Sequence, residues 1–68
     1  MPSSVIRAFR YLPEEEQLEI TFISGRRYRY LKVPPSIYDR MRAAFSKGEF
    51  FNQHIRDHFD FAPVDAVS

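Results

Sequence analysis

The chain has 68 residues, no cysteine and a formal net charge of +1 at pH 7, with 44% hydrophobic and 16% aromatic side chains. This length allows one small domain, and the lack of cysteine excludes disulfide bridges and cysteine-ligated metal sites. No segment approaches the roughly 18 consecutive apolar residues of a membrane span, and the N-terminus lacks the features of a signal peptide. We therefore expect a soluble cytoplasmic protein with a stability of about 3–5 kcal/mol.

The charges are unevenly distributed along the chain. Eight of the ten lysine and arginine side chains lie in residues 26–56, which carry only two carboxylates. The first 25 residues carry two arginines and four glutamates, and the last twelve carry three aspartates. A segregated basic segment favours a polyanionic partner. The alternative is that these charges are only the solvated surfaces of small elements.

Two strands are predicted in the first third of the chain. Residues 5–11 are predicted to form the first, in which Ile6 and Phe9 lie three apart. This spacing favours a β-bulge or a sheet partly covered on both faces. Apolar residues at 18, 20 and 22 alternate with polar ones and predict a central, half-buried strand.

A third strand contains Tyr28 and Tyr30, which alternate with Arg27 and Arg29. Because strand side chains point alternately to opposite faces, the tyrosines share one face and the arginines the other.

The connection between the second and third strands decides which side chains meet. A two-residue loop would place the arginines opposite the apolar face of the second strand. A three-residue loop at residues 24–26 pairs Phe22 with Tyr28 and Ile20 with Tyr30 instead, so this pairing is the one we predict. Gly25 would supply the positive φ that the loop needs.

Two helices are predicted after the double proline at residues 34–35, which ends the sheet. Ile37, Met41 and Ala44 form an apolar stripe on the first helix. Ser46 and Glu49 have the spacing of a capping box and predict the start of the second helix.

The predicted fold is α+β: a three-stranded antiparallel β-meander with two short C-terminal α-helices packed on the tyrosine face. Residues 1–60 would form a single domain, and residues 61–68, which show no periodicity, a flexible C-terminal tail. The expected buried residues are Leu18, Ile20, Phe22, Tyr28, Tyr30, Ile37, Met41, Phe50, Phe51 and Ile55.

Three motifs in order along the chain resemble one family. They are Ser3-Ser4-x-Ile6, Phe22-x-x-Gly25-x-x-Tyr28-x-Tyr30-x-x-Val33-Pro34 and Ser46-Lys47-Gly48-x-Phe50-Phe51-Asn52-x-x-Ile55-Arg56. This combination is similar to the KTSC domain, a small module named from the C-terminus of some lysyl-tRNA synthetases that also occurs as a stand-alone bacterial protein. The resemblance covers residues 3 to about 59 and implies RNA binding by association with the synthetase, but no established activity.

The leading functional hypothesis is a small RNA-binding module that contacts tRNA-like or other structured RNA through its phosphates. Candidate contacts are Arg26, Arg27, Arg29, Lys32, Arg40, Lys47 and Arg56. Tyr28 and Tyr30 are candidates for base stacking, although their strand partners favour a place in the core. The alternative is a protein-interaction module that uses the open sheet face or edge, with an apolar patch at Ile23 and Leu31, as a monomer or weak homodimer.

No cofactor, metal site or catalytic activity is predicted. His54 and His58 have a metal-compatible spacing but lack a clear third ligand, so we expect His54 to be packed and His58 exposed. The glutamates at 14–16 form a solvated turn, and no serine lies in a nucleophile motif. For Asn52 we expect a structural hydrogen bond.

Overall fold

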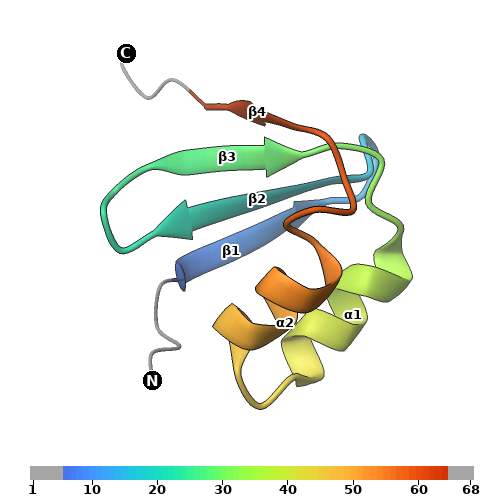
Figure 1. The fold of residues 1–68 in the computed structure, drawn as a ribbon. Helices are drawn as coiled ribbons and strands as arrows, with labels where there is room; N and C mark the ends of the chain where they lie inside the picture. Colours follow the sequence, from blue (N-terminus) through green and yellow to red (C-terminus); the bar gives the residue numbers. More distant parts are fainter. Residues whose placement is uncertain (1–5, 65–68) are drawn as a thin grey trace.

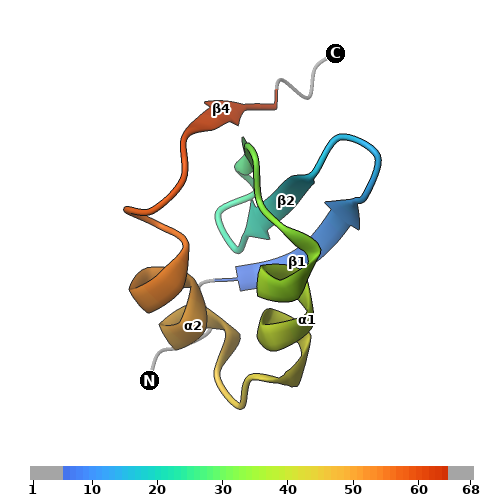
Figure 2. The ribbon, with the colours of Figure 1, turned by 90° about the vertical axis from the view of Figure 1, so that its right-hand side faces the viewer.

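The computed structural model describes residues 6–64, which form a four-stranded antiparallel sheet and two helices (Figure 1). The strands β1 (Ile6–Leu12), β2 (Gln17–Phe22), β3 (Arg27–Tyr30) and β4 (Phe61–Pro63) lie in the sheet in that order. The helices α1 (Pro35–Ala43) and α2 (Lys47–His54) lie on the same side of the sheet (Figure 1, Figure 2). The predicted α+β class and the packing of both helices on one face are confirmed.

One hydrophobic core lies between the sheet and the helices. Leu18, Ile20 and Tyr30 contribute to it from β2 and β3, and Met41 and Phe51 from the helices. Other residues expected in the core, among them Phe22, Tyr28, Ile37 and Phe50, are half-buried against it. Val33, which we expected only to end the sheet, is completely buried.

The predicted bulge in β1 is confirmed. The register between β1 and β2 shifts between Ile6 and Ala8, so that Ile6 lies opposite Phe22 and Phe9 lies opposite Ile20. The extra residue lets two apolar side chains that are three apart in sequence reach the same face of the sheet.

The predicted register between β2 and β3 is wrong by two residues. Tyr28 lies opposite Ile20, and Tyr30 lies opposite Leu18. The loop does contain three residues, but they are 23–25: the Gly25 N–H donates to the Phe22 carbonyl (2.8 Å), and the Phe22 N–H donates to the Arg26 carbonyl (2.9 Å). Gly25 has a φ of 96°. A three-residue hairpin loop takes its left-handed residue at the last position, which moves the loop one residue toward the N-terminus.

A fourth strand replaces part of the expected tail, so the prediction of three strands and of a flexible segment from residue 61 onward is wrong for β4. Phe61 lies opposite Tyr30, and Pro63 lies opposite Tyr28. The Leu31 N–H donates to the Asp60 carbonyl (2.8 Å), and the Val64 N–H donates to the Arg27 carbonyl (2.9 Å). These bonds satisfy backbone groups at the edge of β3, and a three-residue strand with a proline has no periodicity to reveal it.

The start of α2 follows the prediction. The Ser46 hydroxyl oxygen accepts a hydrogen bond from the Glu49 N–H at 3.2 Å. No return bond from the Glu49 side chain is present among residues 6–64, so the cap is one-sided. Ser3 and Ser4 of the first motif, the start of the first predicted strand, and residues 65–68 lie outside the described residues.

Candidate nucleic-acid interface

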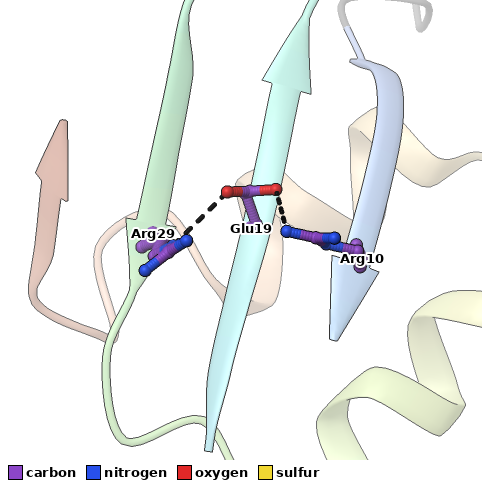
Figure 3. Close-up of polar contacts among 3 residues, drawn as sticks. All are labelled: Arg10, Glu19 and Arg29. Atoms are coloured by element: carbon purple, nitrogen blue, oxygen red, sulfur yellow. Dashed lines mark hydrogen bonds and ion pairs between the residues drawn. The ribbon is translucent and has the colours of Figure 1, made fainter. Parts of the chain in front are cut away.

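One side of the sheet carries a row of charged side chains from three neighbouring strands. Arg10 of β1 lies opposite Glu19 of β2, and Glu19 lies opposite Arg29 of β3. The Glu19 carboxylate binds the Arg10 guanidinium through one oxygen and the Arg29 Nε through the other, at 3.3 Å each (Figure 3). The Glu19 side chain is only 8% exposed because both arginines cover it. Strand pairing alone therefore brings together three residues that are far apart in sequence.

The row belongs to the face of the sheet that points away from the helices, because its residues alternate with the buried Leu18, Ile20 and Tyr30. Arg27 and its partner Thr21 form the neighbouring row on this face. We call Arg10, Glu19, Thr21, Arg27 and Arg29 the outer face. The predicted outward placement of Arg27, Arg29 and Thr21 is confirmed.

The outer face is positively charged, because it has three arginines and a single carboxylate, which Arg10 and Arg29 flank. It contains a shallow hollow of about 400 Å³ whose lining includes Arg10, Glu19 and Arg27. Each guanidinium has five N–H donors, and Glu19 engages only some of those on Arg10 and Arg29. Arg27 has no ion pair with any residue of the range 6–64, so with respect to this range its donors and the remaining ones of Arg10 and Arg29 are available to an anionic partner.

A second hollow lies on the helix side of the sheet, where β3, β4 and α2 meet. It has a volume of about 440 Å³ and is lined mainly by aromatic side chains. Its lining consists of Phe22, Tyr28, Tyr30, Phe51, Asn52, Arg56 and Phe61. We call it the aromatic pocket.

The aromatic walls of this pocket form a continuous set of ring contacts. Phe61 packs edge-on against Tyr28, with ring centroids 5.4 Å apart, and lies tilted against Tyr30 at 5.3 Å. Phe51 closes the inner end against Tyr30 at 5.4 Å. Phe61 remains 52% exposed, so this wall is open to solvent.

The Tyr30 hydroxyl lies in a setting that keeps it protonated. Burial is the main cause of its raised pKa, and the neighbouring Tyr28 raises it further. Arg56 lowers the pKa of Tyr30 and Asp57 raises it, by smaller amounts. At pH 7 the phenol is therefore a neutral donor and acceptor.

The remaining candidate residues do not join either site. Arg26 is exposed directly after the hairpin loop, and Lys32 is exposed with a left-handed φ of 57°, two residues after the end of β3. On α1, the Arg40 guanidinium lies over the Phe50 ring, 5.5 Å from its centroid. The seven predicted cations thus do not form one continuous stripe: Arg27 and Arg29 lie on the outer face, and Arg56 lies at the aromatic pocket.

Lys47 has a structural role that we did not predict. Its ammonium group donates to the Ala44 carbonyl at 2.6 Å and to the Arg42 carbonyl at 3.1 Å. These carbonyls lie at the C-terminal end of α1, where the backbone has no further helical donors and a positive charge is favourable. The side chain is therefore engaged by the helix junction.

Other expectations have mixed outcomes. His54 is half-buried with its ring 4.5 Å from that of Phe50, and His58 is exposed, as predicted. Asn52 is exposed and its side chain has no hydrogen bond among residues 6–64, so the predicted structural bond is wrong.

Two residues of the sites, Arg10 and Phe61, were not predicted from the sequence, because each reaches its site only through strand pairing. Ile23 lies in the hairpin loop before β3 and Leu31 directly after the other end of β3, so the strand separates them and they do not form one apolar patch.

Two absences concern the described part of the chain. Within residues 6–64 no cluster of three or more His, Cys, Asp or Glu side chains could hold a metal ion. Neither α1 nor α2 is long and apolar enough to cross a bilayer.

Comparison with known proteins identifies the family to which this module belongs. The family model of the KTSC domain matches residues 2–59. The chain belongs to the KTSC domain family.

The relatives include both small proteins and a part of a larger enzyme. The chain is 45% identical over 58 residues to a lysine–tRNA ligase of Nostoc punctiforme, covering 85% of the chain but only 10% of the ligase. It is 38% identical over 66 residues to an uncharacterized protein of Stutzerimonas stutzeri, covering 96% of the chain and 93% of that protein. The crystal structure of a KTSC domain protein of Yersinia pestis superposes with a TM-score of 0.87 at 34% identity, covering 94% of this chain and 90% of that one.

Proposed function

We propose that this domain binds RNA through its outer face, as a binding module without catalytic activity. The observation that carries the proposal is that Arg10 and Arg29 flank the Glu19 carboxylate, with Arg27 in the neighbouring row, on the face that the helices leave uncovered. Arginine forks match phosphate oxygens, and a flat positive face allows several phosphates to be bound at once.

Glu19 acts in this proposal as a positioning residue. By binding one donor group on each side, it holds the Arg10 and Arg29 side chains over the sheet rather than letting them sample many rotamers. Less rotamer entropy is then lost when an RNA phosphate binds. The lysine–tRNA ligases that contain a related segment act on tRNA, so a structured RNA of that kind is the first ligand to test.

Salt dependence of binding tests the proposal directly. Each phosphate contact contributes about −0.7 for single strands, or about −0.9 for duplexes, to the slope of log affinity against log salt. The double variant Arg27→Gln with Arg29→Gln should therefore make the slope for a single-stranded RNA less negative by about 1.4. The matched control is Arg42→Gln, because Arg42 lies on α1 and pairs with Asp39 at 3.9 Å.

A second variant should raise the affinity for RNA instead of lowering it. Glu19→Gln removes the negative charge that competes with phosphate for Arg10 and Arg29, while its amide oxygen can still accept a hydrogen bond from one of the two arginines and keep part of the positioning. The gain in net positive charge should outweigh the lost positioning, so RNA binding should become tighter. Thermal melts of every variant establish that the fold is intact. Equal slopes for wild type and the double variant would refute the outer face as the RNA site. The alternative of a protein partner would gain support if wild type bound no RNA at physiological salt.

A further inference from the structure

The aromatic pocket contains polar groups that the domain itself does not use. Among residues 6–64, neither the Asn52 amide, the Arg56 guanidinium nor the hydroxyls of Tyr28 and Tyr30 takes part in a side-chain hydrogen bond. Arg56 also has no ion pair within this range. Its backbone N–H donates to the Phe51 carbonyl at 2.9 Å, so the main chain is fixed while the guanidinium has no partner among the described residues. These groups are therefore available to a ligand.

The arrangement combines a stacking surface, a hydrogen-bonding amide and one cation. The volume of about 440 Å³ falls within the range of about 300–1,000 Å³ that small-molecule sites occupy. Within the described part of the chain, Arg56 is the only charged residue of the lining, and no carboxylate of that part lines the pocket. Asp57, the next residue in the chain, lies outside the lining. The chemistry thus suits a ligand with a flat aromatic part and a single anionic group.

A nucleotide combines an aromatic base and an anionic phosphate in one small molecule. Every nucleobase has a π-face that stacks on Tyr or Phe, and an asparagine amide can pair with donor and acceptor atoms on a base edge. A phosphate takes a bidentate contact from a guanidinium. We propose that the aromatic pocket binds a nucleoside 5′-monophosphate unit, either free or as an unpaired nucleotide of an RNA, with its phosphate on Arg56.

The proposal deepens the RNA function but does not depend on the outer face. Tyr28 and Tyr30 point to the helix side of β3, whereas Arg27 and Arg29 point to the other side. A base bound in the aromatic pocket and an RNA backbone bound on the outer face would consequently be separate contacts. Variants in one site leave the other intact, so the two proposals fail separately.

Titration of the isotope-labelled full chain with AMP, adenosine and ribose 5-phosphate, followed by amide chemical shifts, tests the site. AMP should shift amides of residues 28–30, 51–56 and 61–62. Adenosine should bind more weakly, because it lacks the phosphate, and ribose 5-phosphate more weakly still. Arg56→Gln should weaken AMP by at least about tenfold while leaving adenosine unchanged.

Arg40→Gln is the matched control, because Arg40 is an exposed arginine of α1 outside the pocket lining. A second variant, Asn52→Asp, keeps the side-chain shape but adds a negative charge, so it should also weaken AMP. Both altered residues are exposed, and the amide spectra report folding in the same experiment. An RNA duplex with a single-stranded overhang, compared with a blunt duplex, separates the two sources of nucleotide: Arg56→Gln should affect only the overhang.

Several outcomes would overturn the proposal. AMP shifts confined to the outer face, or an AMP affinity unchanged by Arg56→Gln, would remove the pocket as the site. Equal binding of inorganic phosphate and AMP would show an anion site without base recognition. Stronger binding of a peptide with a C-terminal aromatic residue than of AMP would assign the pocket to a protein partner instead.

Discussion

Replacing Tyr11 by phenylalanine removes a single hydrogen bond and should lower the stability by a measurable amount. The Tyr11 hydroxyl donates to the Val33 carbonyl at 2.6 Å, and Val33 is completely buried. The variant leaves this carbonyl without its partner, at a cost of about 1–2 kcal/mol. The stacking of the Tyr11 ring on Tyr38, with centroids 5.0 Å apart, stays in place because phenylalanine keeps the ring. For a domain this small, we expect a Tm lower by about 4–8 °C per kcal/mol.

The Tyr11 hydroxyl also leads to a prediction about stability at alkaline pH. Burial raises the pKa of Tyr11 above the ordinary value of 10.0, and the charges of Glu16 and Asp39 raise it further. A pKa that is higher in the folded state stabilises the protein at lower pH, and this contribution is lost as the pH rises through the folded pKa. Above pH 10, the free energy of unfolding of wild type should therefore fall more steeply than that of Tyr11→Phe. The difference in stability between the two proteins should narrow.

Urea unfolding at pH 7 and at several pH values above 10 measures both effects. Tyr38→Phe is the control, because it removes a hydroxyl from the other ring of the same stack, and that hydroxyl has no hydrogen bond among residues 6–64. The reasoning is refuted if Tyr11→Phe is as stable as wild type at pH 7. A stability gap that stays constant with pH would contradict the assignment of the proton to Tyr11.

Three further substitutions test the core, the helix junction and the hairpin. Tyr30→Ala should cost about 3–5 kcal/mol in thermal or urea unfolding, because the ring is 4% exposed; wild-type stability would show that it lies outside the core. Lys47→Ala should cost about 1 kcal/mol by urea titration, because two carbonyls at the end of α1 lose a charged donor, whereas Arg26→Ala, at an exposed residue next to the hairpin loop, should change little; equal effects would argue against the cap. Gly25→Ala should cost about 1–2 kcal/mol from its φ of 96° alone, since an added Cβ meets no atom within 4 Å; a neutral result in chemical denaturation would contradict this loop geometry.

Side-chain alternation predicted the two faces of β3 correctly but not the register. The tyrosines face the core and the arginines face outward whether Tyr28 lies opposite Phe22 or opposite Ile20, because a shift of two residues preserves the face. Only the position of Gly25 within the loop distinguishes the two registers. The signal in the sequence that fixes the register is the rule that the left-handed residue comes last in a three-residue loop.

The sites depend more on long-range pairing than on local pattern. The predicted β-meander places β1 and β3 beside β2, but Arg10 and Arg29 meet at Glu19 only through the register of these strands, which no spacing in the sequence reveals. The aromatic pocket likewise needs β4, whose three residues lack any periodicity. Lys47 looked like a free cation because the sequence motif predicted a helix start at this position but not the neighbouring end of α1.

The two outermost strands of the sheet limit how this protein can meet another chain. β4 is three residues long and contains Pro63, which has no backbone N–H to donate. β1 is interrupted by its bulge between Ile6 and Ala8, and it contains two exposed arginines, Arg7 and Arg10. Short, kinked or charged edge strands resist the addition of a further strand from a neighbouring molecule, which is the usual route to β-aggregation. We therefore expect the domain to remain dispersed at high concentration and to recognise its partners through side chains rather than through main-chain pairing.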